Sequence, residues 1–105
     1  MNILLDECVP WPMHRCLGTH QCVTVQQRGW MGIKNGDLLQ VAESEFDLFI
    51  TSDQNIRYQQ NLARRRIAIL ELSSNSIRRI SAAASVIQTA IAAMKPGEFR
   101  RLDIP

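Results

Sequence analysis

The stretch DLFITSDQN, from Asp47 to Asn55, holds a short apolar run that ends abruptly in Thr-Ser-Asp. An apolar run without polar alternation is typical of a strand buried on both faces, as in a parallel sheet. Polar residues follow where such a strand leaves its sheet. We therefore predict a strand over 47–51 and a polar site around Asp53 at its carboxyl end.

Similar runs recur along the chain and alternate with helical patterns. Further strands are predicted over 2–5, 20–25, 67–72 and, at one edge, 98–104. Helices are predicted over 10–17, 37–46, 55–63 and 77–94. Strands that alternate with single helices form right-handed crossovers. The fold class is therefore α/β, a three-layer α/β/α sandwich around a central, mainly parallel sheet of four to five strands.

At 105 residues the chain has the length of one ordinary domain, and we predict a single domain over 1–105. A content of 46% hydrophobic and 21% charged residues is that of a globular protein. Three cysteines without a Cys-x-x-Cys pair argue against a disulfide framework. No signal peptide and no membrane-spanning stretch stands out, so we expect a cytoplasmic protein that does not insert into a membrane.

Charge is distributed unevenly along the chain. Residues 1–53 carry seven acids and three Lys/Arg, a net charge of −4, whereas residues 54–105 carry three acids and nine Lys/Arg, a net charge of +6. An acidic centre beside a basic surround suits a metal site that acts on a phosphate polymer. Solvated arginines with no such role are the simpler alternative.

Several carboxylates fall where ligands bind in parallel sheets. Asp6 and Glu7 directly follow the first strand, Asp53 follows the third, and Asp37 begins the helix before the third strand. If the strand order is 2-1-3-4-5, these acids share the carboxyl edge of neighbouring strands. Each aspartate alone is also a good helix cap. A cluster of like charges, however, persists most easily when a divalent cation neutralises it.

Oxygen ligands without a complete His/Cys set favour Mg²⁺ or Mn²⁺ as the cofactor over zinc. The commonest use of such a site is phosphoryl transfer, in which the metal polarises the phosphate and orients the attacking water. The sequence has neither a Gly-x-x-x-x-Gly-Lys loop nor a Gly-x-Gly-x-x-Gly motif, which argues against nucleoside triphosphates and dinucleotides.

Three motifs, NILLDE, GWMGIKNGDLL and FITSDQN, together resemble the short bacterial branch of the PIN-like nuclease superfamily, which is associated with toxin–antitoxin (VapBC-like) pairs. The similarity spans about residues 2–72. It implies a metal-dependent endoribonuclease, a hydrolase that cleaves phosphodiester bonds in single-stranded RNA. It also implies a small antitoxin protein as partner, and a homodimer.

Matched motif by motif, the resemblance implies that Asp6, Asp37 and Asp53 are catalytic metal ligands and that Glu7 assists them. Two features depart from the family pattern. Cys8 stands where the branch usually has Asn, and a longer PIN domain supplies a further acid late in the chain. Glu71 and Asn55 are the local candidates for that further role.

RNA contacts are predicted from loop and basic residues. Trp30 is placed to stack on an unpaired base and Lys34 to meet a phosphate, although an aromatic residue in a loop also packs down as a lid. The other predicted contacts follow Asp53 on the basic half of the chain, where they guide RNA, receive an acidic antitoxin segment or are simply solvated: Asn55, Arg57, Arg64 and Arg65.

Two alternatives remain open. One is a catalytically inactive PIN-like scaffold that acts only by binding a protein partner. The other is a receiver-like phosphoacceptor domain, which would use the acids after the first strand, Asp53, Ser73 and the Lys95-Pro96 pair. Against the receiver, Lys95 is predicted to end a helix and not a strand, and the spacing from Asp53 to Leu72 is short.

Overall fold

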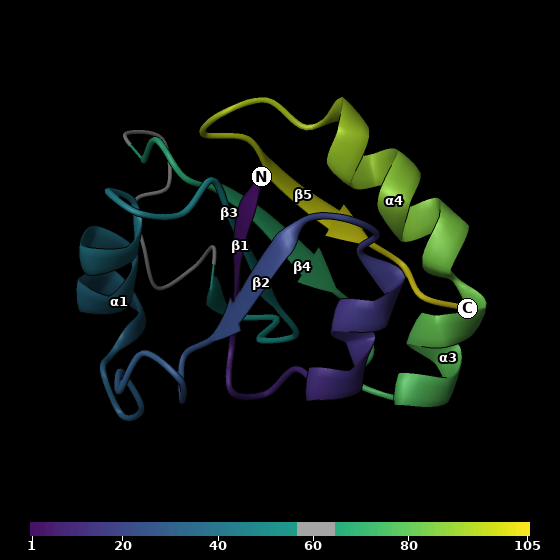
Figure 1. Cartoon of the computed structure of the whole chain (residues 1–105), viewed down its shortest axis with the longest axis horizontal. Coiled ribbons are helices and arrows are strands. Elements are labelled where there is room, and N and C mark those ends of the chain that lie inside the picture. Colours follow the sequence, from purple (N-terminus) through teal and green to yellow (C-terminus); the bar gives the residue numbers. More distant parts are fainter. Residues whose placement is uncertain (57–64) are drawn as a thin grey trace.

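The computed structural model describes residues 1–56 and 65–105, apart from the side chain of Asn35. Its centre is a five-stranded sheet in which every neighbouring pair is parallel, in the order β2-β1-β3-β4-β5 (Figure 1). The strands are β1 (Asn2–Leu5), β2 (Gln21–Thr24), β3 (Leu48–Thr51), β4 (Ala68–Leu72) and β5 (Phe99–Leu102). The predicted α/β class and the adjacency of the first and third strands are confirmed.

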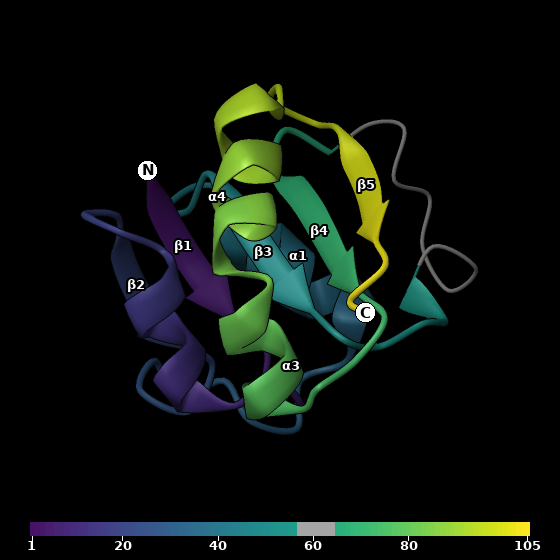
Figure 2. The same ribbon diagram turned by 90° about the vertical axis from the view of Figure 1, so that its right-hand side faces the viewer.

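Helices cover both faces of the sheet, which gives three layers (Figure 2). One face carries the 3₁₀ helix η1 (Trp11–Cys16) together with α3 (Ile77–Ala82) and α4 (Ala84–Ala93). The other face carries α1 (Asn35–Ala42). All carboxyl ends of the strands lie at one edge, since the sheet is parallel throughout.

Two apolar clusters hold these layers together, because successive strand residues point to opposite faces. Ile3, Leu5 and Ile50 pack under η1, α3 and α4. Leu4 and Phe49 pack on the opposite face, under α1. The interior strands are therefore buried on both sides, which is why they lack polar alternation.

Two predicted helices differ from the structure. The helix predicted over 77–94 is divided at Ala83, whose N–H is shared between the carbonyls of Arg79 and Ile80, at 3.1 and 3.0 Å. This bifurcated bond tightens one turn and separates α3 from α4. The helix predicted over 37–46 ends at Ala42, whose carbonyl accepts the N–H of Phe46 as the chain turns toward β3. The helix predicted over 55–63 lies outside the described residues, except at its start.

Over residues 1–56 and 65–105, no helix has the length and apolar character needed to cross a bilayer. The described α4, for example, has ten residues.

Candidate functional site

A row of polar side chains crosses four strands at the carboxyl edge of the sheet. Thr51 pairs with Glu71 across β3 and β4, and Glu71 pairs with Arg101 across β4 and β5. Asp6 follows β1 directly and contacts Thr51. These four residues are called the polar row below. By strand alternation they share the face of Leu4 and Phe49, which is the face covered by α1.

Asp6 is buried and hydrogen-bonded. The residue as a whole is 7% exposed. Oδ1 accepts the N–H of Glu7 at 2.8 Å, and Oδ2 accepts the hydroxyl of Thr51 at 2.7 Å. The thiol of Cys8 also donates to Oδ2, at 3.5 Å. Buried carboxylates persist when donors satisfy them, and these contacts fix the orientation of the Asp6 carboxyl group.

Thr51 connects Asp6 with Asp53. Its buried Oγ1 donates to Asp6 and accepts the N–H of Asp53 at 3.0 Å. Asp53 is half-buried, and its Oδ1 accepts the N–H of Asn55 at 2.9 Å. Asp53 therefore caps the turn that follows β3, as its capping interpretation predicts. The same residue is also tied to the Asp6 carboxylate through one hydroxyl group.

Cys8 joins the two loops that carry these acids. Its Sγ accepts the N–H of Ser52 at 3.4 Å, and the Ser52 hydroxyl donates to the Cys8 carbonyl at 3.4 Å. Sγ also lies 3.6 Å from Oγ1 of Thr51. The cysteine that departs from the family pattern is thus part of the hydrogen-bond network around Asp6.

Glu71 is fully buried in β4, with 0% exposure. Its Oε2 accepts from Nη1 of Arg101 at 2.7 Å. Its Oε1, in contrast, has no hydrogen-bond partner in the described part of the chain. An unsatisfied buried acceptor costs about 1–3 kcal/mol, and more when charged, so this oxygen is open to a donor or a cation. Sequence reasoning reached Glu71 only through the resemblance, whereas the strand register places it in the polar row.

The remaining predicted acids are exposed. Glu7 follows Asp6, and Asp37 lies in the first turn of α1, whose start is at the same edge (Figure 1). In residues 1–56 and 65–105, no three His, Cys, Asp or Glu side chains are grouped so that they could hold one metal ion. Asp6 and Asp53 are linked through Thr51, but Asp37 is not brought into a common ligand set with them.

Trp30 packs down and does not lie open as a stacking surface. Its indole meets the ring of Phe46 edge-on, with centroids 6.1 Å apart, and the guanidinium of Arg28 lies 4.6 Å from its centroid. Phe46 lies just before β3, at the amino edge of the sheet. Trp30 is therefore directed away from the polar row, and the lid interpretation describes it better.

The other predicted RNA contacts have mixed outcomes. Lys34 and Asn55 are exposed, while Arg57 and Arg64 lie outside the described residues. Arg65 is bound internally: its Nη1 lies 3.2 Å from Oε2 of Glu43, and Nη2 donates to the carbonyl of Gly36 at 3.4 Å.

The backbone N–H of Arg66, and then the side chain of Arg65, lower the pKa of Glu43 below its usual value. The ionised Glu43 therefore stabilises the fold above the pKa of the unfolded chain, and this contribution is lost as the pH falls through the lowered pKa. These contacts tie the start of β4 to the end of α1.

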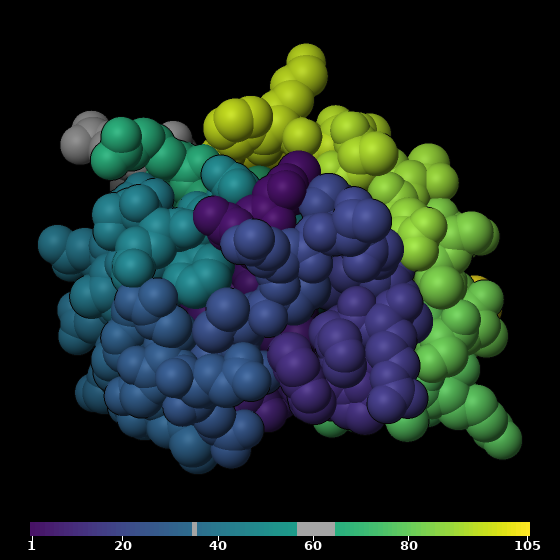
Figure 3. Space-filling model, in the orientation of Figure 1, coloured from purple at the N-terminus to yellow at the C-terminus, as the bar shows by residue number. Residues whose placement is uncertain are grey.

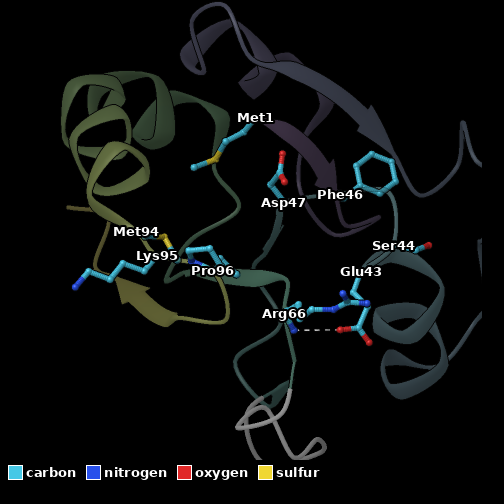
Figure 4. A pocket seen from close by; sticks show the side chains of 10 residues that line it. Met1, Glu43, Ser44, Phe46, Asp47, Arg66, Met94, Lys95 and Pro96 are labelled. Carbon is cyan, nitrogen blue, oxygen red and sulfur yellow. Dashed lines mark hydrogen bonds between the residues drawn. The ribbon is translucent and has the colours of Figure 1, made fainter.

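A hollow of about 560 Å³ opens at the amino edge, opposite the polar row (Figure 4). It has a buried apolar floor and a charged rim, and Figure 4 shows Asp47 across from Arg66. None of the predicted site residues lines it. The lining residues are Met1, Glu43, Ser44, Phe46, Asp47, Arg66, Ala68, Met94, Lys95 and Pro96.

Comparison of the chain with protein-family models, with curated proteins and with solved structures finds no match.

Proposed function

We propose that this chain is a metal-dependent endoribonuclease of the PIN-like kind that hydrolyses phosphodiester bonds in single-stranded RNA. The observation that carries the proposal is the polar row, in which Asp6, Thr51 and Glu71 come from adjacent parallel strands at the edge where such sheets bind ligands. The resemblance further supports a role as the toxin of a toxin–antitoxin pair in the cytoplasm, with a small antitoxin and a homodimer as its assemblies.

The chemistry of the donors fits a hard divalent cation. Glu71 has a buried oxygen without a hydrogen-bond partner in the described chain, and the Asp6 carboxylate lies in the same row. We expect Asp6, Glu71 and Asp53 to hold Mg²⁺ or Mn²⁺ after a shift of their side chains, because the described residues form no three-acid group as they stand. Asp37 and Glu7 lie at the exposed margin of the edge. When bound, the metal would supply Lewis-acid polarisation of the phosphate.

The protein groups around the acids orient them. Thr51 holds the Asp6 carboxylate and the Asp53 backbone at once, and the two hydrogen bonds that Ser52 donates to Cys8 keep the two loops together. Arg101 fixes the carboxylate of Glu71 from one side only. These contacts limit the movement of Asp6, Asp53 and Glu71 at the edge.

The test is cleavage of single-stranded RNA by purified protein in Mn²⁺, with and without a chelator. Asp6→Asn and Asp53→Asn should reduce cleavage to the level of the chelated sample. Asp47→Asn is the matched control, because Asp47 is an exposed carboxylate at the opposite edge, and it should cleave like the wild type. Equal cleavage by the wild type and both edge variants would mean a contaminating nuclease and would overturn the proposal.

A catalytically inactive scaffold is the second candidate, favoured by the absence of a three-acid group in residues 1–56 and 65–105. Wild-type protein that binds RNA or a partner protein without any metal-dependent cleavage would establish it. The receiver-like alternative is disfavoured, since Lys95 lines the hollow at the amino edge while Asp53 follows β3 at the carboxyl edge.

A further inference from the structure

The helical layer made by η1, α3 and α4 contains no acidic residue. No Asp or Glu occurs between Cys8 and Gly36, or between Leu72 and Gly97. Three exposed arginines lie in this layer: Arg15 on η1, and Arg78 and Arg79 on α3. All charged side chains of these three helices are therefore basic.

These three arginines differ from four of the five others that the structure describes, and the fifth, Arg66, has no ion pair either. Arg28, Arg65, Arg100 and Arg101 each form an ion pair with a carboxylate. Within the described chain, no ion pair involves Arg15, Arg78 or Arg79. Cations without internal partners keep their full attraction for an external polyanion.

An exposed aromatic pair lies beside these arginines. The rings of Trp11 and His14 are stacked, with centroids 4.1 Å apart and planes inclined by 16°. Nδ1 of His14 lies 2.8 Å from the Trp11 carbonyl, which fixes the imidazole against the indole. Trp11 nevertheless remains 40% exposed. A preorganised ring with open surface loses little freedom when a base stacks on it.

The aromatic pair lies at the same edge of the sheet as the polar row, which faces the α1 side. Trp11 begins η1, which follows the Asp6 loop at the carboxyl edge of the sheet. The helix α3 starts at the same edge after β4, and it packs beside η1 (Figures 1 and 2). In the space-filling view the surfaces of residues 11–16 and of the α3–α4 segment adjoin (Figure 3).

We propose that single-stranded RNA crosses this layer on its way to the acids, with an unpaired base stacked on Trp11 and neighbouring phosphates on Arg15, Arg78 and Arg79. The inference deepens the proposed function and rests on it. It assigns the base-stacking role to Trp11 in place of Trp30. One large apolar residue is exposed on each helix of this layer, namely Trp11, Ile77 and Val86. The charged residues of these helices are all basic, which suits a nucleic acid better than an apolar protein interface.

Binding is measured apart from cleavage, with a labelled single-stranded RNA and a chelator present throughout. Trp11→Ala should weaken binding by about ten-fold or more, whereas Trp11→Phe keeps most of the affinity. The double variant Arg78→Gln/Arg79→Gln should lower the slope of log affinity against log salt by about 1.4, the value for two lost phosphate contacts on a single strand. Arg66→Gln/Lys95→Gln is the charge-matched control, because both residues line the hollow at the opposite edge, and it should leave the slope unchanged.

Tryptophan fluorescence gives an independent reading, because the chain has two tryptophans. In a Trp30→Phe background RNA should quench the remaining Trp11 emission, and in a Trp11→Phe background it should leave Trp30 emission unchanged. Circular dichroism confirms that each variant is folded.

Unchanged RNA affinity in Trp11→Ala together with an unchanged salt slope in the arginine variant would overturn the inference. So would wild-type protein that binds an acidic peptide on this layer but not RNA. Failure of the proposed function is separate: wild type that binds RNA through these residues but does not cleave it in Mn²⁺ supports the binding surface and removes the nuclease activity.

Discussion

At Thr51 a single hydroxyl group serves two acids. It donates to the Asp6 carboxylate and accepts the N–H of Asp53, and it has no contact with solvent. A hydroxyl in this position is needed for its hydrogen bonds and not for its volume. The Thr-x-Asp pattern at the end of β3 is therefore a means of fixing two loops relative to each other.

Thr51→Val keeps the shape of the side chain and removes both hydrogen bonds. We expect a loss of about 1–3 kcal/mol in the free energy of unfolding, because the Asp53 N–H loses its acceptor and Oδ2 of Asp6 keeps only the longer bond from the Cys8 thiol. Urea denaturation followed by circular dichroism measures the loss.

Thr89→Val is the matched control. The Thr89 hydroxyl bonds only to the Ser85 carbonyl one turn earlier in α4, and its residue is exposed. The control should change stability by less than about 0.5 kcal/mol. Equal losses in the two variants would contradict the linking role of Thr51.

Sequence reasoning located Asp6 and Asp53 because both follow apolar runs directly, and the structure places both at the expected edge. For Trp30 it offered two roles, a base-stacking surface and a packed lid. The structure shows Trp30 in contact with Arg28, its near neighbour in the sequence, and with the ring of Phe46, which is distant in sequence. The burial of Glu71 likewise depends on strand register, which no local pattern reveals.

At the scale of elements, the turn between α4 and β5 contacts the chain just before β4. Gly97 has a φ of +78°, and a Cβ at this position would lie 2.7 Å from the carbonyl oxygen of Arg65. Glycine is thus required at position 97 for two reasons: the left-handed backbone conformation and the short distance to the Arg65 carbonyl oxygen. The contact brings the start of β5 against the start of β4.

Gly97→Ala should destabilise the protein by about 1–2 kcal/mol for the left-handed backbone alone, and further because backbone atoms must move apart. Gly18→Ala measures the cost of the left-handed backbone alone, because Gly18 has a φ of +67° and its added Cβ would have no neighbouring atom within 4 Å. Thermal unfolding of both variants gives the difference. A Gly97→Ala loss no larger than that of Gly18→Ala would show that the close approach is relieved at no cost.

The three inner strands were predictable because each is short, largely apolar and bounded by polar or turn residues, whereas the edge strands β2 and β5 contain more polar residues. Helix ends were less predictable. The periodicity of Ile80, Ile87 and Ile91 continues through Ala83, because both α3 and α4 bury their apolar stripe on the same face of the sheet. The sequence pattern therefore gives no sign of the bifurcated hydrogen bond of Ala83 that divides α3 from α4.

At the scale of the whole molecule, acids and bases are segregated by layer. Carboxylates of the polar row lie at the carboxyl edge on the α1 side of the sheet, and the charged residues of η1, α3 and α4 on the other side are all basic. Divalent metal and RNA are thus expected to meet at the carboxyl edge, with opposite demands on charge.

Metal binding should stabilise the entire fold, because the proposed ligands come from β1, β4 and the end of β3. At a Mn²⁺ concentration of 100 times its dissociation constant, the expected gain is about 2.7 kcal/mol. Glu71→Gln should lose most of this gain, since its amide no longer supplies the open anionic oxygen. Thermal unfolding with and without Mn²⁺ measures both values, and an equal gain in wild type and variant would remove Glu71 from the metal site.

The strand that comes first in the chain, β1, lies inside the sheet between β2 and β3. Because all pairings are parallel, each strand is joined to its neighbour by a crossover, and no pair of strands forms as a local hairpin. Closing such long loops precedes the gain from pairing, which slows folding. We therefore expect both edges of β1 to stay unpaired until β2 and β3 have formed. During folding, NILL is then the segment that most needs protection from aggregation.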